Sequence, residues 1–177
     1  LCCVLASVSN GSIVVSAATS GKIGNQVSFS FRSSTKTLTI KGKGEIDVDM
    51  IFNAPWEDYA EDIETLIVEE GVSVIPDYTF MCLKNLKKVK LADSVTSLGW
   101  YSFESCVSLK SIQLPKSLKT LVRGAFNGCT NLKEISISKD NDYFTTKDGV
   151  LFTKDMKTLM FYPPAKSGSS YTIPNGV

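Results

Sequence analysis

The chain has 177 residues, 43% of them apolar, and a formal net charge of +1, which together indicate one soluble domain. It contains no histidine, so it lacks the commonest general base, the usual partner of a nucleophilic serine or cysteine, and the usual zinc ligand. We therefore predict that the protein is not an enzyme and that it binds no cofactor.

The first twenty residues carry no charged side chain, and they begin with an apolar run. The stretch Ile13–Ala18 ends in small residues, a pattern typical of the end of a secretory signal peptide, with cleavage after Ala17 or Ala18. We predict that residues 1–18 are a signal-peptide remnant and that Cys2 and Cys3 leave with it. The alternative is a short apolar N-terminal strand.

Residues 19–62 are predicted to form a β-hairpin followed by an acidic segment. Apolar and polar residues alternate on both sides of a turn at Arg32–Lys36, with the apolar positions at Val27, Phe29, Phe31, Leu38 and Ile40. From Glu45 to Glu70 there are ten carboxylates and no lysine or arginine. We expect the hairpin to cap the structure that follows by covering its open end, and we expect the acidic residues to discourage edge-to-edge association there.

The middle of the chain repeats itself with a period of 23 residues. Six columns of apolar residues keep this step over three successive copies. They are Val72/Val95/Leu118, Ile75/Leu98/Leu121, Phe80/Phe103/Phe126, Leu86/Leu109/Leu132, Val89/Ile112/Ile135 and Leu91/Leu114/Ile137. A fixed period of this length is typical of stacked repeats, in which each coil buries the apolar side chains of its neighbours.

Each repeat is predicted to be a single coil with little helix. The alternation in Ile112–Leu114 indicates a half-buried strand. Val95–Leu98 indicates a second short extended segment, and Phe103–Leu109 is long enough for only one α-helical or 3₁₀ turn. The predicted fold is mainly β with short helical turns, a solenoid of coils of about 23 residues over residues 63–177, preceded by the hairpin cap.

The register of the repeat loosens after Ile137. A turn at Lys147–Gly149 between two short apolar runs predicts a hairpin insertion over about residues 139–162. Leu159 and Phe161 lie 24 residues after the apolar positions of the last predicted strand, and they are predicted to form a further rung. Residues 171–177 match residues 112–118 and open a repeat that is not finished, so we expect the chain to be a fragment of a longer protein.

Cysteines and short acidic motifs are the candidates for cross-links and metal sites. Cys106 and Cys129 share one column, which places them close enough for a disulfide. Side chains in a parallel ladder seldom aim their sulfur atoms at each other, however, and free cysteine packs well as a small apolar residue, so we predict free thiols. Two segments begin like calcium loops but fail at the next ligand position, so we predict no metal; they are Asp47–Asp49, which fails at Ile51, and Asp140–Asp142, which fails at Phe144.

The repeat resembles that of the BspA-like leucine-rich repeat family. The resemblance rests on Phe126-Asn-Gly-Cys129-Thr-Asn-Leu132-Lys-Glu-Ile135-Ser-Ile137 and on the Ile/Leu-x-Leu-Pro pattern between copies. It implies a right-handed solenoid whose strands line a concave sheet, in secreted or surface proteins of microbes with a role in adhesion or surface interaction. Two departures are Leu83, which fills the cysteine column in the first copy, and the pair Trp100-Tyr101 where small residues are more usual.

The outward side chains of the predicted strands are the candidate binding site, because the chain offers no catalytic constellation. Basic residues dominate this region of the chain, with nine lysines and arginines against three acidic residues from Met81 to Ile137. The candidate partner-binding residues are Lys87, Lys88, Lys90, Lys110, Gln113, Lys133 and Ser136, with Trp100 and Tyr101 as exposed aromatic anchors. The alternative interpretation of the lysines is a solubility device.

We therefore predict an exported, secreted or cell-surface protein that binds an extracellular protein or a glycan, such as one from a host matrix, through its concave strand face. Nucleic acid is disfavoured, because the basic residues are not interleaved with aromatic ones, and no stretch after the N-terminus is long and apolar enough to span a membrane. The alternatives are a non-catalytic targeting module of a larger surface enzyme and a purely structural wall component.

Overall fold

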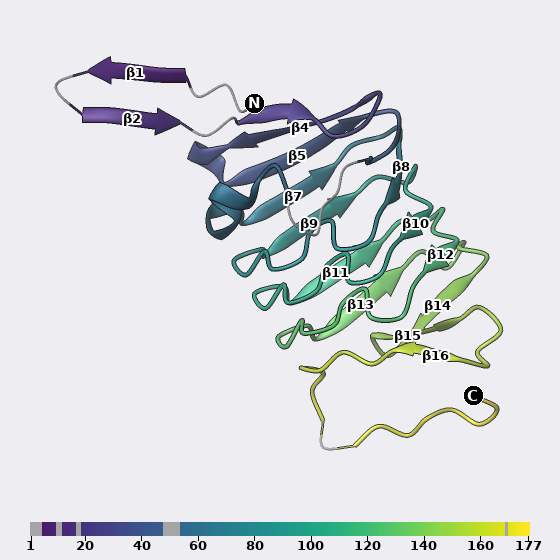
Figure 1. The fold of residues 1–177 in the computed structure, drawn as a ribbon. Helices are drawn as coiled ribbons and strands as arrows, with labels where there is room; N and C mark the ends of the chain where they lie inside the picture. The colour runs from purple at the N-terminus through teal and green to yellow at the C-terminus, as the bar shows by residue number, and fades with distance from the viewer. Residues whose placement is uncertain (1–4, 10–11, 17–18, 48–53, 169) are drawn as a thin grey trace.

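The structure is a computed structural model that describes residues 5–9, 12–16, 19–47, 54–168 and 170–177. It is built almost entirely of strands and turns (Figure 1). Among the described residues there are two short 3₁₀ helices, η1 (Ser33–Thr35) and η2 (Glu57–Asp62). The segment Phe103–Leu109 forms separate turns and no helix, because single bonds such as Cys106 N–H to the Phe103 carbonyl (3.4 Å) do not continue into a second turn.

The largest sheet combines antiparallel and parallel strands. Its order is β3 (Ser20–Lys22), β4 (Val27–Arg32), β5 (Thr37–Gly42), β7 (Thr65–Val68) and β9 (Lys88–Leu91). β4 and β5 pair antiparallel from Val27↔Gly42 to Arg32↔Thr37, which confirms the predicted hairpin. β5 then pairs parallel with β7, so the second strand of the hairpin is also the first strand of the parallel array.

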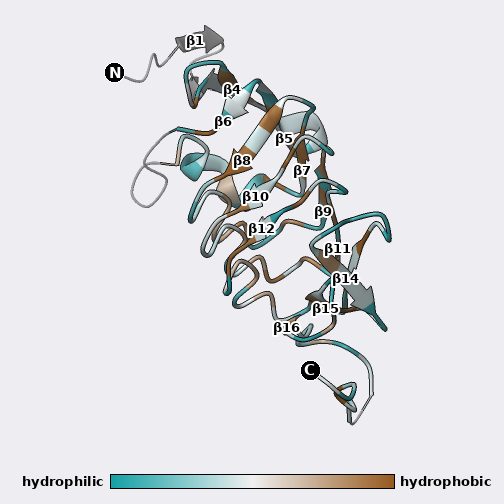
Figure 2. Ribbon diagram, turned by 90° about the vertical axis from the view of Figure 1, so that its right-hand side faces the viewer, coloured by the Kyte–Doolittle hydropathy of each residue, from teal (hydrophilic) through white to brown (hydrophobic). Residues whose placement is uncertain are grey.

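Two further sheets continue the parallel array. One has the order β6 (Gly44–Glu45), β8 (Val72–Ile75), β10 (Ser97–Leu98) and β12 (Thr120–Leu121), and the other pairs β11 (Ser111–Leu114) with β13 (Glu134–Ile137). The strands β8, β10 and β12 run down one side of the molecule, and β7, β9 and β11 run down the other (Figure 2). Partners such as Leu66↔Val89 and Ile112↔Ile135 are 23 residues apart, the period seen in the sequence.

The phenylalanine column is stacked as its spacing predicts. The ring centroids of Phe80 and Phe103 are 5.4 Å apart, those of Phe103 and Phe126 are 5.7 Å apart, and all three rings are buried. Trp56 extends the column at one end, 5.5 Å from Phe80, and Phe161 extends it at the other, 5.7 Å from Phe126. The column therefore runs from the acidic segment to the last strand, and each ring is covered by those before and after it.

The buried cysteines are packing residues, as predicted. Cys106 and Cys129 are free thiols with fully buried side chains. The sulfur of Cys106 lies 3.3 Å from the Phe80 carbonyl oxygen, and that of Cys129 lies 3.1 Å from the Phe103 carbonyl oxygen. Burial raises the pKa of Cys106 well above its usual value and raises the pKa of Cys129 to about 11, so neither is ionised at neutral pH.

After β13 the chain reverses direction twice. β14 (Phe144–Lys147), β15 (Val150–Thr153) and β16 (Leu159–Phe161) form an antiparallel sheet, which confirms the predicted hairpin. The prediction that Leu159 and Phe161 form a further parallel rung is wrong, because Phe161 pairs antiparallel with Leu151. The strands are antiparallel because the chain turns back tightly between them, with positive φ at Asp148 (54°), Gly149 (76°) and Met156 (59°). A parallel pair of strands would need a long crossover connection instead.

The last residues form no strand. The Val177 N–H lies 3.4 Å from the Pro174 carbonyl, a turn like that between the Leu118 N–H and the Pro115 carbonyl (3.2 Å), and the Ile173 side chain is exposed. The unfinished repeat therefore stays a prediction.

The N-terminal residues are described only in some stretches. β1 (Leu5–Ser9) and β2 (Ser12–Ser16) pair antiparallel as a separate hairpin (Figure 1). Several residues named in the sequence predictions lie outside the described residues: Cys2, Cys3, Ala17, Ala18, Asp49 and Ile51. The signal-peptide interpretation accordingly stays a prediction.

Candidate functional site

The strand face is defined here as the side chains of β7, β9, β11 and β13 that point away from the core, together with the residues just before these strands. Exposure alternates along β11, where Ser111 and Gln113 are exposed while Ile112 and Leu114 are buried. Lys88, Lys90 and Ser136 lie on the outward side in the same alternating pattern on β9 and β13. The sequence prediction placed these side chains on the outside, and the structure agrees.

The lysines of the strand face differ in their charge partners. The Lys87 ammonium lies 2.7 Å from a carboxylate oxygen of Glu64, and the other oxygen of Glu64 is 2.7 Å from Lys36. No such ion pair is found for the other four lysines within the ranges that the structure describes; they are Lys88, Lys90, Lys110 and Lys133. Beyond the first repeat, therefore, four lysines of the strand face have no carboxylate within ion-pair distance among the described residues.

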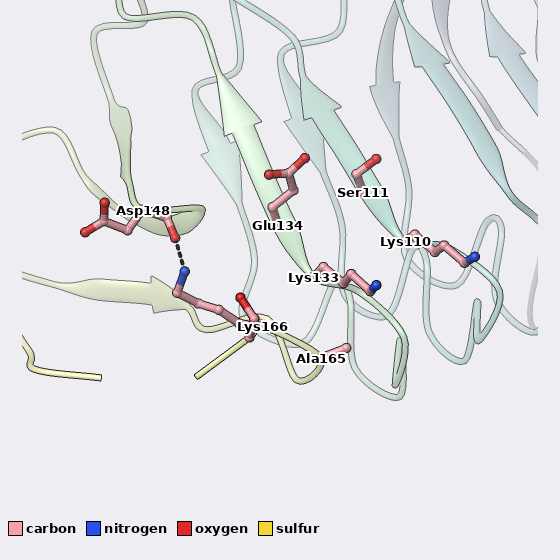
Figure 3. A pocket seen from close by; sticks show the side chains of 8 residues that line it. Lys110, Ser111, Lys133, Glu134, Asp148, Ala165 and Lys166 are labelled. Carbon is pink, nitrogen blue, oxygen red and sulfur yellow. Dashed lines mark hydrogen bonds between the residues drawn. The ribbon is translucent and has the colours of Figure 1, made fainter. Parts of the chain in front are cut away.

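The end of the strand face forms an open pocket of about 470 Å³ (Figure 3). One wall consists of Lys110, Ser111, Lys133 and Glu134, on and just before β11 and β13; the two lysines point the same way from neighbouring coils. The opposite wall consists of residues from the β14–β15 turn and from the segment after β16, namely Asp148, Ala165, Lys166 and Ser167. Lys110 and Lys133 were predicted from the sequence, whereas the second wall was not.

The second wall is held against the strand face by backbone contacts. The Ile135 N–H donates to the Gly149 carbonyl at 3.1 Å, and the Ala165 N–H donates to the Leu132 carbonyl at 2.9 Å. Within the second wall, the Lys166 ammonium donates to the Asp148 carbonyl. Gly149 is needed at the tip of the turn, because a Cβ there would lie 3.0 Å from the Cβ of Glu134. No sequence signal pointed to this wall, since its position depends on the two chain reversals after β13.

A second pocket of about 310 Å³ lies where the strand face is interrupted. β9 and β11 are neighbours in the array but belong to different sheets, and no ladder joins them. Val89 and Leu91 are only partly buried there, although Leu66 and Ile112 in the column of Val89 are 0% and 3% exposed, and Leu114 in the column of Leu91 is 1% exposed. Lys90 and Gln113 line this pocket, so two more predicted residues meet at one place.

The remaining predicted residues are scattered. Lys87 and Lys88 line a separate pocket of about 310 Å³ beside Lys36 and Glu64. Ser136 lines none of these three pockets. Trp100 and Tyr101 follow β10, on the other side of the coil from the strand face (Figure 2). The structure therefore brings the predicted residues together in pairs and does not form one continuous site.

The pockets contain amines, carboxylates and hydroxyls, which suit the binding of polar or charged groups. Within the ranges that the structure describes, no group of three or more histidine, cysteine, aspartate or glutamate side chains is arranged to hold a metal ion. In the same ranges no helix has the length and apolar character needed to cross a membrane.

The paired carboxylate of Glu64 predicts an acid-dependent stability. Hydrogen bonds from Lys36 and Lys87 lower the pKa of Glu64 from its ordinary value of 4.5 to about 2. Its folded-state pKa is depressed, so the pair stabilises the protein above about pH 4.5 and this contribution is lost as the pH falls toward 2. We expect Glu64→Gln to be less stable than the wild type at pH 7 and the difference to narrow over that window, measured by urea denaturation at stepped pH.

The control for this measurement is Glu61→Gln, because Glu61 is exposed and forms none of the ion pairs found among the described residues. A Glu64→Gln difference that stays constant from pH 5 to pH 2 would contradict the assignment. Added salt should reduce the difference at pH 7, since Glu64 and its partners are partly exposed.

Comparison with known proteins identifies the family. Residues 58–163 match the family described as "BspA type Leucine rich repeat region (6 copies)". The chain belongs to the BspA-type leucine-rich repeat family. The region of this BspA-type chain that matches contains the strands β7 to β16, and with them the wall of Lys110, Ser111, Lys133 and Glu134 and, from the opposite wall, Asp148.

Two solved structures share the fold at low sequence identity. A leucine-rich repeat protein from Eubacterium ventriosum is 23% identical with a TM-score of 0.52, and the match covers 89% of this chain and 54% of that one. The pneumococcal vaccine antigen PcpA is 18% identical with a TM-score of 0.51, and the match covers 86% and 58%. The BspA-type chain thus spans a little over half the length of these two proteins. A comparison with curated proteins finds no match.

Proposed function

We propose that this BspA-type chain is the binding region of an exported, secreted or cell-surface protein, and that its strand face binds an acidic extracellular protein. The observation that carries the proposal is the set of four lysines on the strand face that have no ion-pair partner among the described residues. Leucine-rich repeats of this kind typically bind proteins and are typically non-catalytic. A vaccine antigen among the structures with the same fold is in keeping with a surface location.

The architecture supports this role through repetition. We interpret the parallel array as a solenoid of coils of about 23 residues, with β3 to β5 as its N-terminal cap and β14 to β16 as an inserted hairpin. Stacked coils place equivalent side chains side by side on an extended face. Such a face offers a protein partner many contacts of one chemical kind, and its charge accelerates association with a partner of opposite charge.

The test is a charge reversal on the strand face. Partners are captured from extracellular-matrix extract, and the dissociation constant of each purified partner is measured for wild type and for the variant Lys88→Glu/Lys90→Glu/Lys110→Glu/Lys133→Glu. Reversing four charges is expected to weaken binding by about fourfold or more, because each exposed ion pair contributes roughly 0.2–1 kcal/mol and four of them contribute about 0.8–4 kcal/mol. Added salt should weaken wild-type binding in the same direction.

The matched control reverses four exposed lysines outside the strand face and leaves the net charge equal to that of the test variant. These are Lys84, Lys119, Lys139 and Lys157, each changed to glutamate. We expect the control to keep wild-type affinity within about twofold, since surface charges away from an interface have small effects. Equal losses in the two variants would show that net charge alone determines binding, and that result would contradict the proposal.

A second candidate function is a non-catalytic targeting module of a larger surface enzyme. The observation that favours it is the length of two proteins with this fold. Their chains are nearly twice as long as the region that matches, because the match covers only 54% and 58% of them. Sequencing the gene across both ends of the chain separates the candidates. A hydrolase domain would favour the module, and further repeats or a surface anchor would favour the binding protein.

A further inference from the structure

Three aromatic rings gather at one corner of the coil, where the chain leaves β8 and β10. This aromatic corner consists of Tyr78, Trp100 and Tyr101. β8, β10 and β12 pair in register through Ile75, Leu98 and Leu121. The positions two residues further on therefore form the column Asp77/Trp100/Arg123, and those three residues further on form the column Tyr78/Tyr101/Gly124.

The tyrosines of the aromatic corner adopt a backbone conformation that normally belongs to glycine. φ is 59° at Tyr78 and 53° at Tyr101, and the third member of the column is Gly124 at 90°. The left-handed region is strained for a residue with a Cβ, and glycine adopts it without this strain. The same conformation recurs in the column Cys82/Ser105/Gly128, at 60°, 56° and 70°, so it belongs to the turns of the repeat, and the side chains are what distinguish the aromatic corner. Two copies thus keep a ring where the third copy has the unstrained residue.

The rings pack on one another in an ordered way. Tyr78 and Tyr101 are stacked with centroids 5.4 Å apart, and the ring of Trp100 meets that of Tyr101 edge-on at 6.3 Å. Gly124 leaves room for this stack, because a Cβ there would lie 3.2 Å from the Tyr101 ring. Trp100 itself is 53% exposed, and the other large apolar residues that are exposed among the described ones are at position 143 or later. The core therefore does not account for Trp100.

The backbone that carries Trp100 is fixed by its neighbours. The Trp100 N–H donates to a carboxylate oxygen of Asp77 at 2.6 Å, and the Trp100 carbonyl accepts from the Tyr78 N–H at 2.8 Å. Gly99 permits this arrangement, since a Cβ there would lie 2.6 Å from the Asp77 nitrogen. An exposed ring on a fixed backbone loses little conformational entropy when it binds a ligand.

We propose that the aromatic corner is a second binding site, and that it takes the pyranose ring of a glycan. The C–H face of a sugar ring carries partial positive charge and suits the negative face of an indole ring. Asp77 and Arg123 lie one coil to either side of Trp100, where a carboxylate can accept and a guanidinium can donate hydrogen bonds to sugar hydroxyls. Arg123 forms none of the ion pairs found within the described ranges.

The size of the aromatic corner favours a sugar over a protein partner. A stable protein interface covers about 800 Å² on each partner and usually has an apolar centre. Trp100 offers one exposed indole ring for contact, and the members of its column on either side are the charged residues Asp77 and Arg123. One ring flanked by an acceptor and a donor is enough for a monosaccharide unit. The site lies away from the strand face, so it does not depend on the function proposed for the lysines.

The test uses intrinsic fluorescence, because the two tryptophans differ in exposure. Trp56 is 1% exposed and Trp100 is 53% exposed, so a ligand-induced change in emission reports on Trp100. The chain is titrated with chitotetraose, cellotetraose and mannotetraose, and affinities for the variants are measured by calorimetry. We expect at least one oligosaccharide to bind saturably and Trp100→Ala to weaken that binding at least about tenfold, as is typical of a central aromatic contact.

Two further variants make the result specific. Arg123→Ala is expected to weaken sugar binding several-fold, and the four-lysine variant of the strand face is expected to bind the sugar as the wild type does. The absence of saturable binding by all three oligosaccharides, or equal affinity in Trp100→Ala, would overturn the proposal. The proposal would also be overturned if the wild type bound no sugar and Trp100→Ala lost the capture of protein partners from extracellular-matrix extract. The aromatic corner would then be part of a protein interface. Urea denaturation checks that each variant is folded.

Discussion

Phe103→Ala is expected to lower the free energy of unfolding by about 3–5 kcal/mol, the usual cost of removing a buried phenylalanine ring. Phe103 is 0% exposed and has a ring on each side, Phe80 at 5.4 Å and Phe126 at 5.7 Å. Alanine at this position would leave a cavity between two coils. Since each coil is stabilised chiefly by its neighbours, we also expect the urea transition to broaden as the two ends of the array become less coupled.

The matched control is Lys110→Ala, an exposed substitution seven residues further along the same coil, which should change stability by about 0.5 kcal/mol or less. Equilibrium urea denaturation followed by far-UV circular dichroism measures both variants. A loss below about 1 kcal/mol for Phe103→Ala would be too small for a buried ring, and it would argue against the stacked column.

Asn141→Ala is expected to cost about 2–4 kcal/mol, because it leaves several buried backbone groups without a partner. The Asn141 side chain is 1% exposed. Its amide nitrogen donates to the carbonyls of Lys116 and Leu118, both at 2.8 Å. Its amide oxygen accepts from the N–H groups of Tyr143 at 2.8 Å and Phe144 at 2.7 Å. One side chain thus joins the preceding coil to the start of β14.

The control for Asn141→Ala is Asn131→Ala. Asn131 also donates from its side chain to a backbone carbonyl, that of Val107 at 2.8 Å, but it is exposed, so water can replace the lost bond. We expect a loss of about 1 kcal/mol or less for the control, measured by the same urea titration. Equal losses in the two variants would show that burial of Asn141 does not matter.

The periodic region of the fold could be predicted from the sequence because apolar spacing and burial have the same cause. The phenylalanine column, the 23-residue strand register and the free thiols of Cys106 and Cys129 all follow from stacking equivalent side chains. The hairpin at Val27–Gly42 was readable for a related reason, since alternation along two runs indicates two paired strands.

The non-periodic region could not be predicted in the same way. The direction of β16 depends on the conformation of Asp148, Gly149 and Met156, and apolar spacing alone does not distinguish a parallel rung from an antiparallel one. Asn141 lies in the segment Asp140–Asp142, which in the sequence looks only like an incomplete calcium loop, whereas its side chain is buried and saturated with hydrogen bonds. The second wall of the pocket beside Lys110 and Lys133 is placed by the same reversals, which is why only these two of its residues were predicted.

The missing ladder between β9 and β11 has a mechanical consequence. On the opposite side of the coil, β10 forms backbone hydrogen bonds with both β8 and β12. The coil that contains β9 and the coil that contains β11 are therefore joined by paired backbone on that side, and by side-chain packing at the strand face. The contact between these two coils is therefore stiffer on the side of β10 than at the strand face. When a pulling force is applied between the two ends of the chain, we expect β9 and β11 to separate before any pair of hydrogen-bonded strands does.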